Sequence, residues 1–199
     1  IKIVYYTHMF ISKKKYYLLI ENTRDLNLNL IKIRNKFIII YRNHNKLEKI
    51  SQIKNFRKKC KKKGIEFFIA NDEVLAVKIN SDGLYISAFN KRLSHIKLIK
   101  NGYKLIGSAH NIKEINQKKL QGCSTIILSR LFKTNYENKK SFLGTIKFNE
   151  IVKRFNIEIA PLGGISKNNL NKLKFVICTS FACLSAIKKK PANIINRLF

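Results

Sequence analysis

Two apolar stretches near the carboxyl end of the chain decide the fold: Ala160-Pro161-Leu162-Gly163-Gly164-Ile165 and Phe181-Ala182-Cys183-Leu184-Ser185-Ala186-Ile187. The first reads as a strand that ends in two glycines, which leave backbone N–H groups bare. The second reads as a strand that ends near Ser185, whose hydroxyl adds another donor. Where two parallel strands end side by side, such donors form a site for a phosphate group. A plain Gly-Gly turn is the alternative interpretation.

The rest of the chain repeats the same alternation of short apolar runs and longer polar segments. The runs are near-continuously apolar, which is typical of parallel strands buried on both faces. They cover residues 16–20, 37–41, 66–70, 83–86, 103–106, 125–128, 157–162 and 181–184. Eight such repeats predict an α/β fold, a single (β/α)8 TIM barrel. A doubly wound open sheet is the alternative, but it uses fewer strands and no G-x-G-x-x-G follows the first run.

Helical periodicity fills three of the intervening segments, at residues 47–62, 111–120 and 146–155. Connections are short and the chain has only two prolines, so no interior domain boundary is indicated. We expect one barrel domain over residues 16–199 and an N-terminal extension over residues 1–15. The chain starts at Ile1 and its only methionine is Met9, so this first segment could also contain a truncated start.

The charge balance is strongly basic, with 41 Lys and Arg against 11 Asp and Glu and a formal net charge of +30. Such a charge usually suggests nucleic acid or an anionic membrane surface. The excess is nearly all lysine, however, and it accompanies abundant Asn and Ile, which A/T-rich codons also favour. The lysines are spread along the chain, and no zinc-finger, RNP-like or basic-zipper pattern occurs. We therefore expect no specific nucleic-acid partner.

The four cysteines show no C-x-x-C spacing, and Cys123, Cys178 and Cys183 lie in apolar strand-like contexts. They are best interpreted as small core residues, without disulfides, which fits a cytoplasmic enzyme. No apolar run approaches the ~18 residues of a transmembrane helix, so no membrane partner is expected.

Five short motifs, in order from about residue 15 to 187, resemble the thiamine phosphate synthase/TenI superfamily of compact (β/α)8 barrels. Residues 162–165 and 181–187 match its Gly-Gly-Ile and V-A-V-I-S-A-I-like strand ends. The other matches are Asn71-Asp72, residues 81–85 (its A-D-G-V-H), residues 107–111 (its G-x-S-x-H-N, one residue shorter), and residues 128–134 with Leu143-Gly144 (its G-P-V-F-P-T…L-G).

The resemblance implies an enzyme of thiamine biosynthesis that joins pyrimidine-methyl pyrophosphate and thiazole phosphate and releases pyrophosphate. It places Mg²⁺ on Asp72, the pyrophosphate on Asn71 and Arg42 with Ser108 nearby, and the thiazole phosphate on Gly163, Gly164, Leu184 and Ser185 with Thr134 nearby. Because Asp72 supplies one carboxylate where the family supplies two, Mg²⁺ binding should be weak or substrate-dependent. The expected partners are therefore small phosphate and pyrophosphate substrates, and a homodimer is left open.

Several positions depart from the family pattern. The family's Gln and Lys after the second strand are here Ile40 and His44, its second metal carboxylate is Asn90, and its mobile-loop Lys is Glu137, with Lys139 and Lys140 close by. The thiazole-phosphate half of the site is thus retained while the metal–pyrophosphate half is eroded. This pattern resembles the TenI branch, whose members act as thiazole tautomerases with a His as proton carrier, or a degenerate barrel that only binds a thiazole phosphate.

His110 is the first candidate for such a proton carrier, since a neutral imidazole can move protons near pH 7. A structural histidine that caps the following helix is the alternative. His44 is a second candidate, whereas His8 in the extension and His95 on a helix surface are expected to take no part. Asp72 can equally be the N-cap of a helix that starts at Glu73, and Arg42 can be a structural ion-pair partner.

Overall fold

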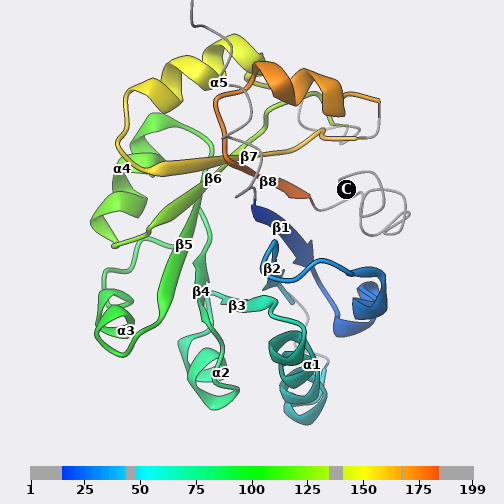
Figure 1. The fold of residues 1–199 in the computed structure, drawn as a ribbon. Coiled ribbons are helices and arrows are strands. Elements are labelled where there is room, and N and C mark those ends of the chain that lie inside the picture. The colour runs from blue at the N-terminus through cyan, green and yellow to red at the C-terminus, as the bar shows by residue number, and fades with distance from the viewer. Residues whose placement is uncertain (1–14, 44–47, 135–140, 167, 184–199) are drawn as a thin grey trace, which may run out of the picture.

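The computed structural model describes residues 15–43, 48–134, 141–166 and 168–183 (Figure 1). Eight parallel strands pair in chain order and close into a barrel, β1-β2-β3-β4-β5-β6-β7-β8. The strands are β1 Lys15–Ile20, β2 Phe37–Tyr41, β3 Glu66–Ala70, β4 Gly83–Ile86, β5 Lys104–Ala109, β6 Thr125–Ser129, β7 Glu158–Leu162 and β8 Ser180–Cys183. The predicted (β/α)8 barrel is confirmed.

Helices surround the strands on the outside of the barrel (Figure 1). The α-helices are α1 Ile50–Lys62, α2 Glu73–Lys78, α3 Ile96–Lys100, α4 Ile112–Leu120 and α5 Gly144–Lys153. The connections after β1 and β7 instead hold short 3₁₀ helices: η1 Thr23–Asp25, η2 Leu28–Leu30 and η3 Leu170–Phe175. Asparagines begin η1 and η2, with their side chains accepting hydrogen bonds from the backbone, which favours short turns over long helices. No helix within the described part of the chain is long and apolar enough to cross a membrane.

The core has two layers, because successive strand residues point to opposite faces of the sheet. The larger layer lies between strands and helices and includes Phe37, Phe67 and Phe148. The smaller layer fills the barrel, and it consists of Tyr17, Leu19, Ile38, Ile40, Phe68, Tyr85, Ile106, Ile127, Ala160 and Ala182. Burial on both sides explains why the strand segments are continuously apolar in sequence. Cys60, Cys123 and Cys183 are free buried thiols, and Cys178 packs partly buried against the larger core layer.

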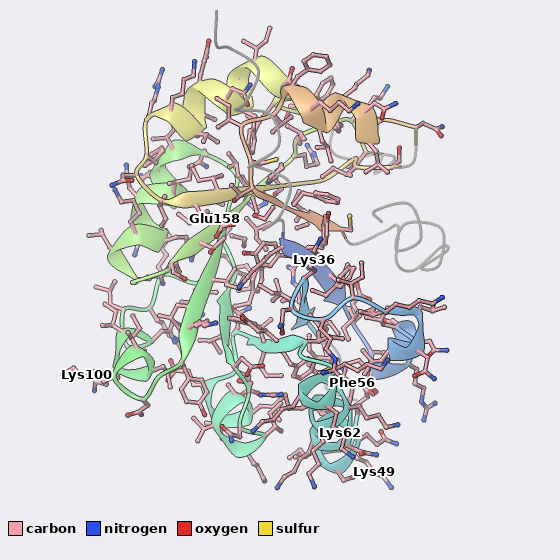
Figure 2. The ribbon with its side chains drawn as sticks, in the orientation of Figure 1. Lys36, Lys49, Phe56, Lys62, Lys100 and Glu158 are labelled. Atoms are coloured by element: carbon pink, nitrogen blue, oxygen red, sulfur yellow. The ribbon has the colours of Figure 1, made fainter. Side chains whose placement is uncertain are left out.

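Exposed lysines mark the ends of the outer helices. Lys49 and Lys62 flank the two ends of α1, and Lys100 ends α3 on another side of the barrel (Figure 2). Phe56 of α1, by contrast, is buried against Phe67 of β3. These positive charges are therefore carried by solvated helix ends around the barrel, and Lys62 and Lys100, at the carboxyl-terminal ends of α1 and α3, also complement the helix dipoles.

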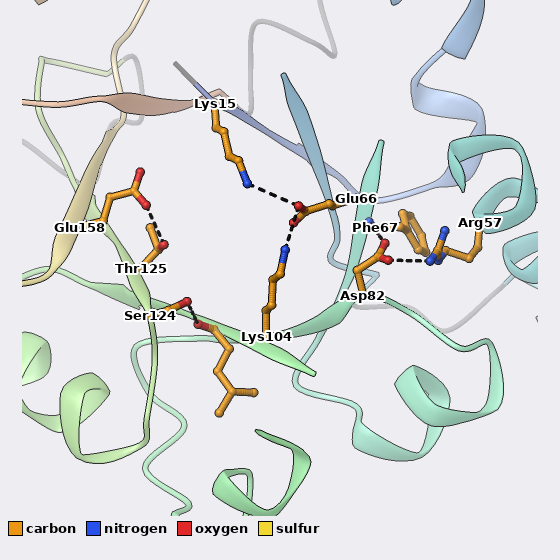
Figure 3. Close-up of polar contacts among 10 residues, drawn as sticks. Lys15, Arg57, Glu66, Phe67, Asp82, Lys104, Ser124, Thr125 and Glu158 are labelled. Carbon is orange, nitrogen blue, oxygen red and sulfur yellow. Dashed lines mark hydrogen bonds and ion pairs between the residues drawn. The ribbon is translucent and has the colours of Figure 1, made fainter. Parts of the chain in front are cut away.

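Polar residues close the barrel at the amino-terminal ends of its strands (Figure 3). Glu66 of β3 accepts hydrogen bonds from Lys15 of β1 at 3.4 Å and from Lys104 of β5 at 2.9 Å. Glu158 of β7 accepts from Thr125 of β6 at 3.0 Å. We call Glu66, Glu158 and their partners the charged floor, because they lie below the apolar interior. In a TIM barrel, residues at this amino-terminal end serve stability.

The floor predicts an acid-sensitive component of stability. Burial alone would raise the pKa of Glu66, but its hydrogen bonds and ion pairs with Lys104 and Lys15 outweigh this and lower the pKa. A lowered pKa stabilises the fold above the ordinary carboxyl range, and the stabilisation is lost as pH falls through the folded-state value. We expect Glu66→Gln to cost up to about 1 kcal/mol near pH 6 and to converge with wild type below about pH 4. Urea unfolding between pH 3 and 7 measures this, with Glu150→Gln on the exposed face of α5 as control.

Candidate active site

The glycine turn after β7 lies against the loop that follows β6. Gly163 and Gly164 have φ values of +100° and +68°, which glycine adopts without strain. The N–H groups of Leu131 and Phe132 donate to the carbonyls of Leu162 and Gly163 at 2.9 and 3.0 Å. The two loops therefore form one unit at the carboxyl-terminal ends of β6 and β7.

The fit around Gly164 excludes any side chain. A Cβ atom there would lie 2.4 Å from the carbonyl oxygen of Lys133 and 2.6 Å from the backbone of Phe132. Among the described residues no acceptor takes the Gly164 N–H, while its carbonyl accepts from Asn169 Nδ2 at 2.7 Å. The turn thus does more than reverse the chain direction, because it leaves the Gly164 N–H as a hydrogen-bond donor at the edge of the candidate site.

Thr134 belongs to the same loop. Its Oγ1 is buried and has no hydrogen-bond partner among the described residues. Buried hydroxyl groups without a partner are costly, so such an atom points to a ligand that completes it. Thr134 and the glycine turn therefore lie together, as the sequence predicts.

Arg42, Tyr85 and Ser108 form the bottom of the site. Ser108 lies in β5, with its side chain close to that of Tyr85, a buried residue of the barrel interior. Burial raises the pKa of Tyr85, while the neighbouring Ser108 side chain and the Arg42 charge act in the opposite direction. Arg42 directly follows β2, where its N–H donates to the carbonyl of Ile20 at 2.8 Å.

Arg42 makes no ion pair with any carboxylate in the described part of the chain, so the structural ion-pair alternative is not supported. Its Nε atom is instead buried without a partner among the residues that the structure describes. A guanidinium with an unused N–H near two hydroxyl groups is suited to bind an oxyanion.

Asn71 presents a donor to the site. Its backbone has a φ of +60°, and its Oδ1 accepts from Ser87 N at 3.0 Å, Ser87 Oγ at 2.8 Å and Asn90 Nδ2 at 3.3 Å. Because the Ser87 N–H can only donate, the atom that faces it must be the amide oxygen. The Asn71 amide nitrogen is left for other partners, which suits an anion rather than a cation.

Asp72 is the N-cap of α2, where Oδ1 accepts from Leu75 N at 2.9 Å. The capping role that the sequence offered as an alternative is therefore confirmed, and the second carboxylate oxygen stays available. The described residues include no group of three His, Cys, Asp or Glu that could hold a metal ion. Mg²⁺ commonly uses one or two carboxylates together with substrate phosphates, so this donor set fits a metal ion only when substrate supplies the other oxygens.

His110 lies at the rim, with 55% of its side chain exposed. Its Nδ1 is 3.0 Å from Glu114 Oε2, which also accepts from the His110 N–H at 2.7 Å, and Asn111 caps α4. Burial raises the pKa of Glu114, but the hydrogen bonds and charge of His110 outweigh this and lower it. His110 is thus part of the helix cap, and its role as a proton carrier stays a prediction.

His95 was expected to take no part and to lie on a helix surface, and that placement is wrong. It precedes α3, is 2% exposed, pairs through Nδ1 with Glu73, and has Nε2 3.4 Å from Asn90 Oδ1. Its main partner, Glu73, is 22 residues away, so no helical periodicity could have found it. Sequence reasoning also gave no role to Tyr85, which lies near Arg42 and Ser108, although residues 81–85 match a family motif.

Leu184 and Ser185, which were predicted to bind the thiazole phosphate, lie outside the described residues. The same holds for His8, His44, Glu137, Lys139 and Lys140, and for most of the predicted extension over residues 1–15. The described part of the chain ends with β8 at Cys183. The predicted strand is therefore seen, whereas the predicted phosphate-binding residues after it are not described.

The closed barrel of eight parallel strands defines a (β/α)8 protein, with polar side chains and backbone donors gathered at the carboxyl-terminal ends of its strands. The thiamine monophosphate synthase family profile matches residues 4–187, and the chain belongs to this family. It is 29% identical over 139 residues to a thiamine-phosphate synthase of Prochlorococcus marinus, a match that covers 69% of this chain and 40% of that protein. It is 24% identical over 180 residues to that of Clostridioides difficile strain 630, a match that covers 88% and 81%.

Among solved structures, thiamine phosphate pyrophosphorylase from Pyrococcus furiosus has a TM-score of 0.73 at 16% identity, and the match covers 94% of this chain and 96% of that one. 3-Hexulose-6-phosphate synthase also matches, with a TM-score of 0.68 at 14% identity over 92% and 97% of the two chains. These likenesses concern the fold. The chain spans less than half the length of the Prochlorococcus relatives it matches.

Proposed function

We propose that the chain is a thiamine phosphate synthase-like transferase that joins pyrimidine-methyl pyrophosphate to thiazole phosphate and releases pyrophosphate. Membership of the family supports this activity. The structure describes three buried side-chain atoms without a hydrogen-bond partner among the described residues: Arg42 Nε, Thr134 Oγ1 and Glu66 Oε2. Glu66 belongs to the charged floor, whereas Arg42 and Thr134 follow the carboxyl-terminal ends of β2 and β6, and this location of two such atoms carries the proposal. Two separate unpartnered atoms at that end fit two phosphate-bearing substrates better than one.

The thiazole phosphate would lie at the glycine turn. The Gly164 N–H and the Thr134 hydroxyl offer donors to its oxygens, and Gly163 shapes the backbone for them. Backbone donors do not depend on side chains, and the basic protein favours any anion there. Leu184 and Ser185, beyond the described residues, would add further donors, as the resemblance implies.

The pyrophosphate would lie at Arg42, Asn71 and Ser108. As the methylene–oxygen bond breaks, its electron pair goes to the pyrophosphate, and the carbon then bonds to the thiazole. Donors aimed at the leaving oxygens stabilise that charge most when water is excluded. Mg²⁺ held by Asp72 together with pyrophosphate oxygens would supply further charge neutralisation.

A thiazole tautomerase is the second candidate, favoured by the fixed orientation of His110. Because Glu114 accepts at Nδ1, the other ring nitrogen is free to exchange a proton with a ligand.

Incubation with both substrates and Mg²⁺ separates the two proposals. Thiamine phosphate supports the synthase, metal-independent isomerisation of the thiazole supports the tautomerase, and the absence of both reactions indicates a binding protein.

Asn90→Asp gives the decisive variant. In the wild type Asn90 Nδ2 donates to Asn71 Oδ1 at 3.3 Å, and a carboxylate would instead set two acceptors against each other. We expect the variant to lose about 1–3 kcal/mol of stability without metal and to regain it with Mg²⁺, and any synthase activity to rise. Thermal melts with and without Mg²⁺ and product assays measure this.

His110→Ala is the matching control for the synthase proposal. A synthase should retain turnover within about tenfold, because the residue caps a helix at the exposed rim. Unchanged metal affinity in Asn90→Asp, together with complete loss of turnover in His110→Ala, would exclude the synthase and leave the metal-free tautomerase.

A further inference from the structure

Lys118 is an unusual lysine, since its side chain lies on α4 but is 0% exposed. Its stem lies over Gly107 of β5, where a Cβ atom would be only 2.8–2.9 Å from the Lys118 Cβ, Cγ and Cδ atoms. A glycine at residue 107 therefore makes the room that the lysine occupies. Burial lowers the pKa of Lys118. Lysine is almost never fully buried unless it is paired, so its partners matter.

The ammonium group binds the loop between β4 and α3. Lys118 Nζ donates to the Asn90 carbonyl at 2.6 Å and to Gln121 Oε1 at 2.8 Å. Gln121 Nε2 donates to the carbonyls of Asn90 at 3.0 Å and Arg92 at 2.7 Å. We call Lys118 and Gln121 the carbonyl clamp.

Neighbouring Gln117 extends the same contact. Its Nε2 donates to the Lys91 carbonyl at 3.4 Å. One face of α4, together with the residue that follows it, thus binds three successive carbonyl groups, at residues 90, 91 and 92. A segment held through three successive carbonyls by a packed helix is fixed in its backbone conformation, which is what a precise site requires of its supporting residues.

The clamped segment carries Asn90 to the candidate site. The Asn90 side chain donates to Asn71 Oδ1 at 3.3 Å and accepts from the Arg92 N–H at 3.1 Å. Asn71 is the residue that presents a free amide donor at the end of β3. Displacement of the segment would therefore move Asn90, and Asn71 would lose one of the contacts that orient its amide.

We propose that Lys118 is a positioning residue for the pyrophosphate side of the site, which it orders through the carbonyls of residues 90–92. The inference rests on the proposed function, because it assumes that the substrate pyrophosphate lies at Asn71. Lys118 itself does not reach a ligand: its Nζ lies under the loop and is used by protein acceptors. The glycine turn after β7 lies in another part of the rim and does not depend on the clamp.

Lys118→Met tests the proposal, since methionine keeps the apolar stem and removes the donor. We expect inorganic pyrophosphate with Mg²⁺ to bind at least tenfold more weakly and thiazole phosphate to bind within twofold of wild type, both by calorimetry. The KM for the pyrimidine substrate should rise at least tenfold, with the KM for thiazole phosphate unchanged. Amide exchange should accelerate at residues 88–92 and not in β7. Lys113→Met, an exposed residue of the same helix, should change none of these.

Gln121→Met provides a second variant should Lys118→Met fail to fold, because it removes two donors and keeps the ammonium; its expected effect has the same pattern and is smaller. Equal weakening of both ligands in the folded variants would overturn the positioning role and indicate general destabilisation. If a variant bound pyrophosphate with wild-type affinity although amide exchange at residues 88–92 was faster, the positioning role would be overturned as well. A wild-type protein that binds neither ligand would overturn the proposed function itself, which is a different result.

Discussion

Gly164→Val is expected to abolish binding of thiazole phosphate, with at least a hundredfold loss of affinity. The residue has a φ of +68°, which a β-branched side chain adopts only with strain, and its Cβ would lie 2.4 Å from the Lys133 carbonyl oxygen. Neither neighbour can yield, because both are backbone atoms of the loop that carries Thr134. The valine therefore separates the two loops that form the phosphate site. Calorimetric titration with thiazole phosphate measures the loss.

Gly102→Val separates this clash from backbone strain alone. Gly102 has a φ of +81°, but a Cβ there would meet no atom within 4 Å. We expect it to cost about 1–2 kcal/mol of stability and to leave thiazole phosphate affinity unchanged. Pyrophosphate binding should survive in folded Gly164→Val, since Arg42 and Asn71 follow other strands, β2 and β3. Wild-type thiazole phosphate affinity in Gly164→Val would show that the glycine turn is not the phosphate site.

The strands were predictable because barrel strands are buried on both faces and so appear as uninterrupted apolar runs. The predicted runs at residues 37–41 and 83–86 coincide with β2 and β4. The run predicted at 103–106 stopped short of Ala109, the end of β5, because Gly107 and Ser108 do not look strand-like. Both have functional reasons to be small: Gly107 admits the Lys118 stem, and Ser108 faces the site. Prediction from local strand propensity therefore failed at Gly107 and Ser108, where the structure requires small side chains.

The candidate site was predictable only as far as its residues follow strand ends. Asn71, Ser108, Thr134 and the glycine turn could be placed from order along the chain. Lys118 could not, because a lysine next to Lys119 is expected to be exposed, although it lies three residues after the buried Ile115, and the local sequence says nothing of a glycine beneath it. His95 failed for the same reason: its burial depends on Glu73, 22 residues away. Long-range polar contacts leave no periodic signal in one sequence.

Arg42→Met is expected to weaken pyrophosphate binding about a hundredfold, or about 2.7 kcal/mol, because it removes charge-assisted hydrogen bonds. The same change should leave the stability of the ligand-free protein unchanged or raise it. The Arg42 Nε atom is buried, and no contact with the described part of the chain offsets its desolvation cost, which the substitution removes. Loss of affinity together with retained or higher Tm is the signature of a ligand-binding arginine.

Arg24→Met supplies the matched control, since Arg24 is an exposed arginine in η1, in the loop that follows the neighbouring strand β1. It should leave both affinity and Tm unchanged. A structural arginine at residue 42 would give the opposite pattern, with a lower Tm and unaltered affinity for pyrophosphate. Salt provides a further check, because screening weakens long-range attraction by the basic protein but much less the contact with a buried guanidinium. The difference in affinity between wild type and Arg42→Met should therefore persist at about 0.5 M salt, whereas attraction due only to the net charge of +30 would vanish.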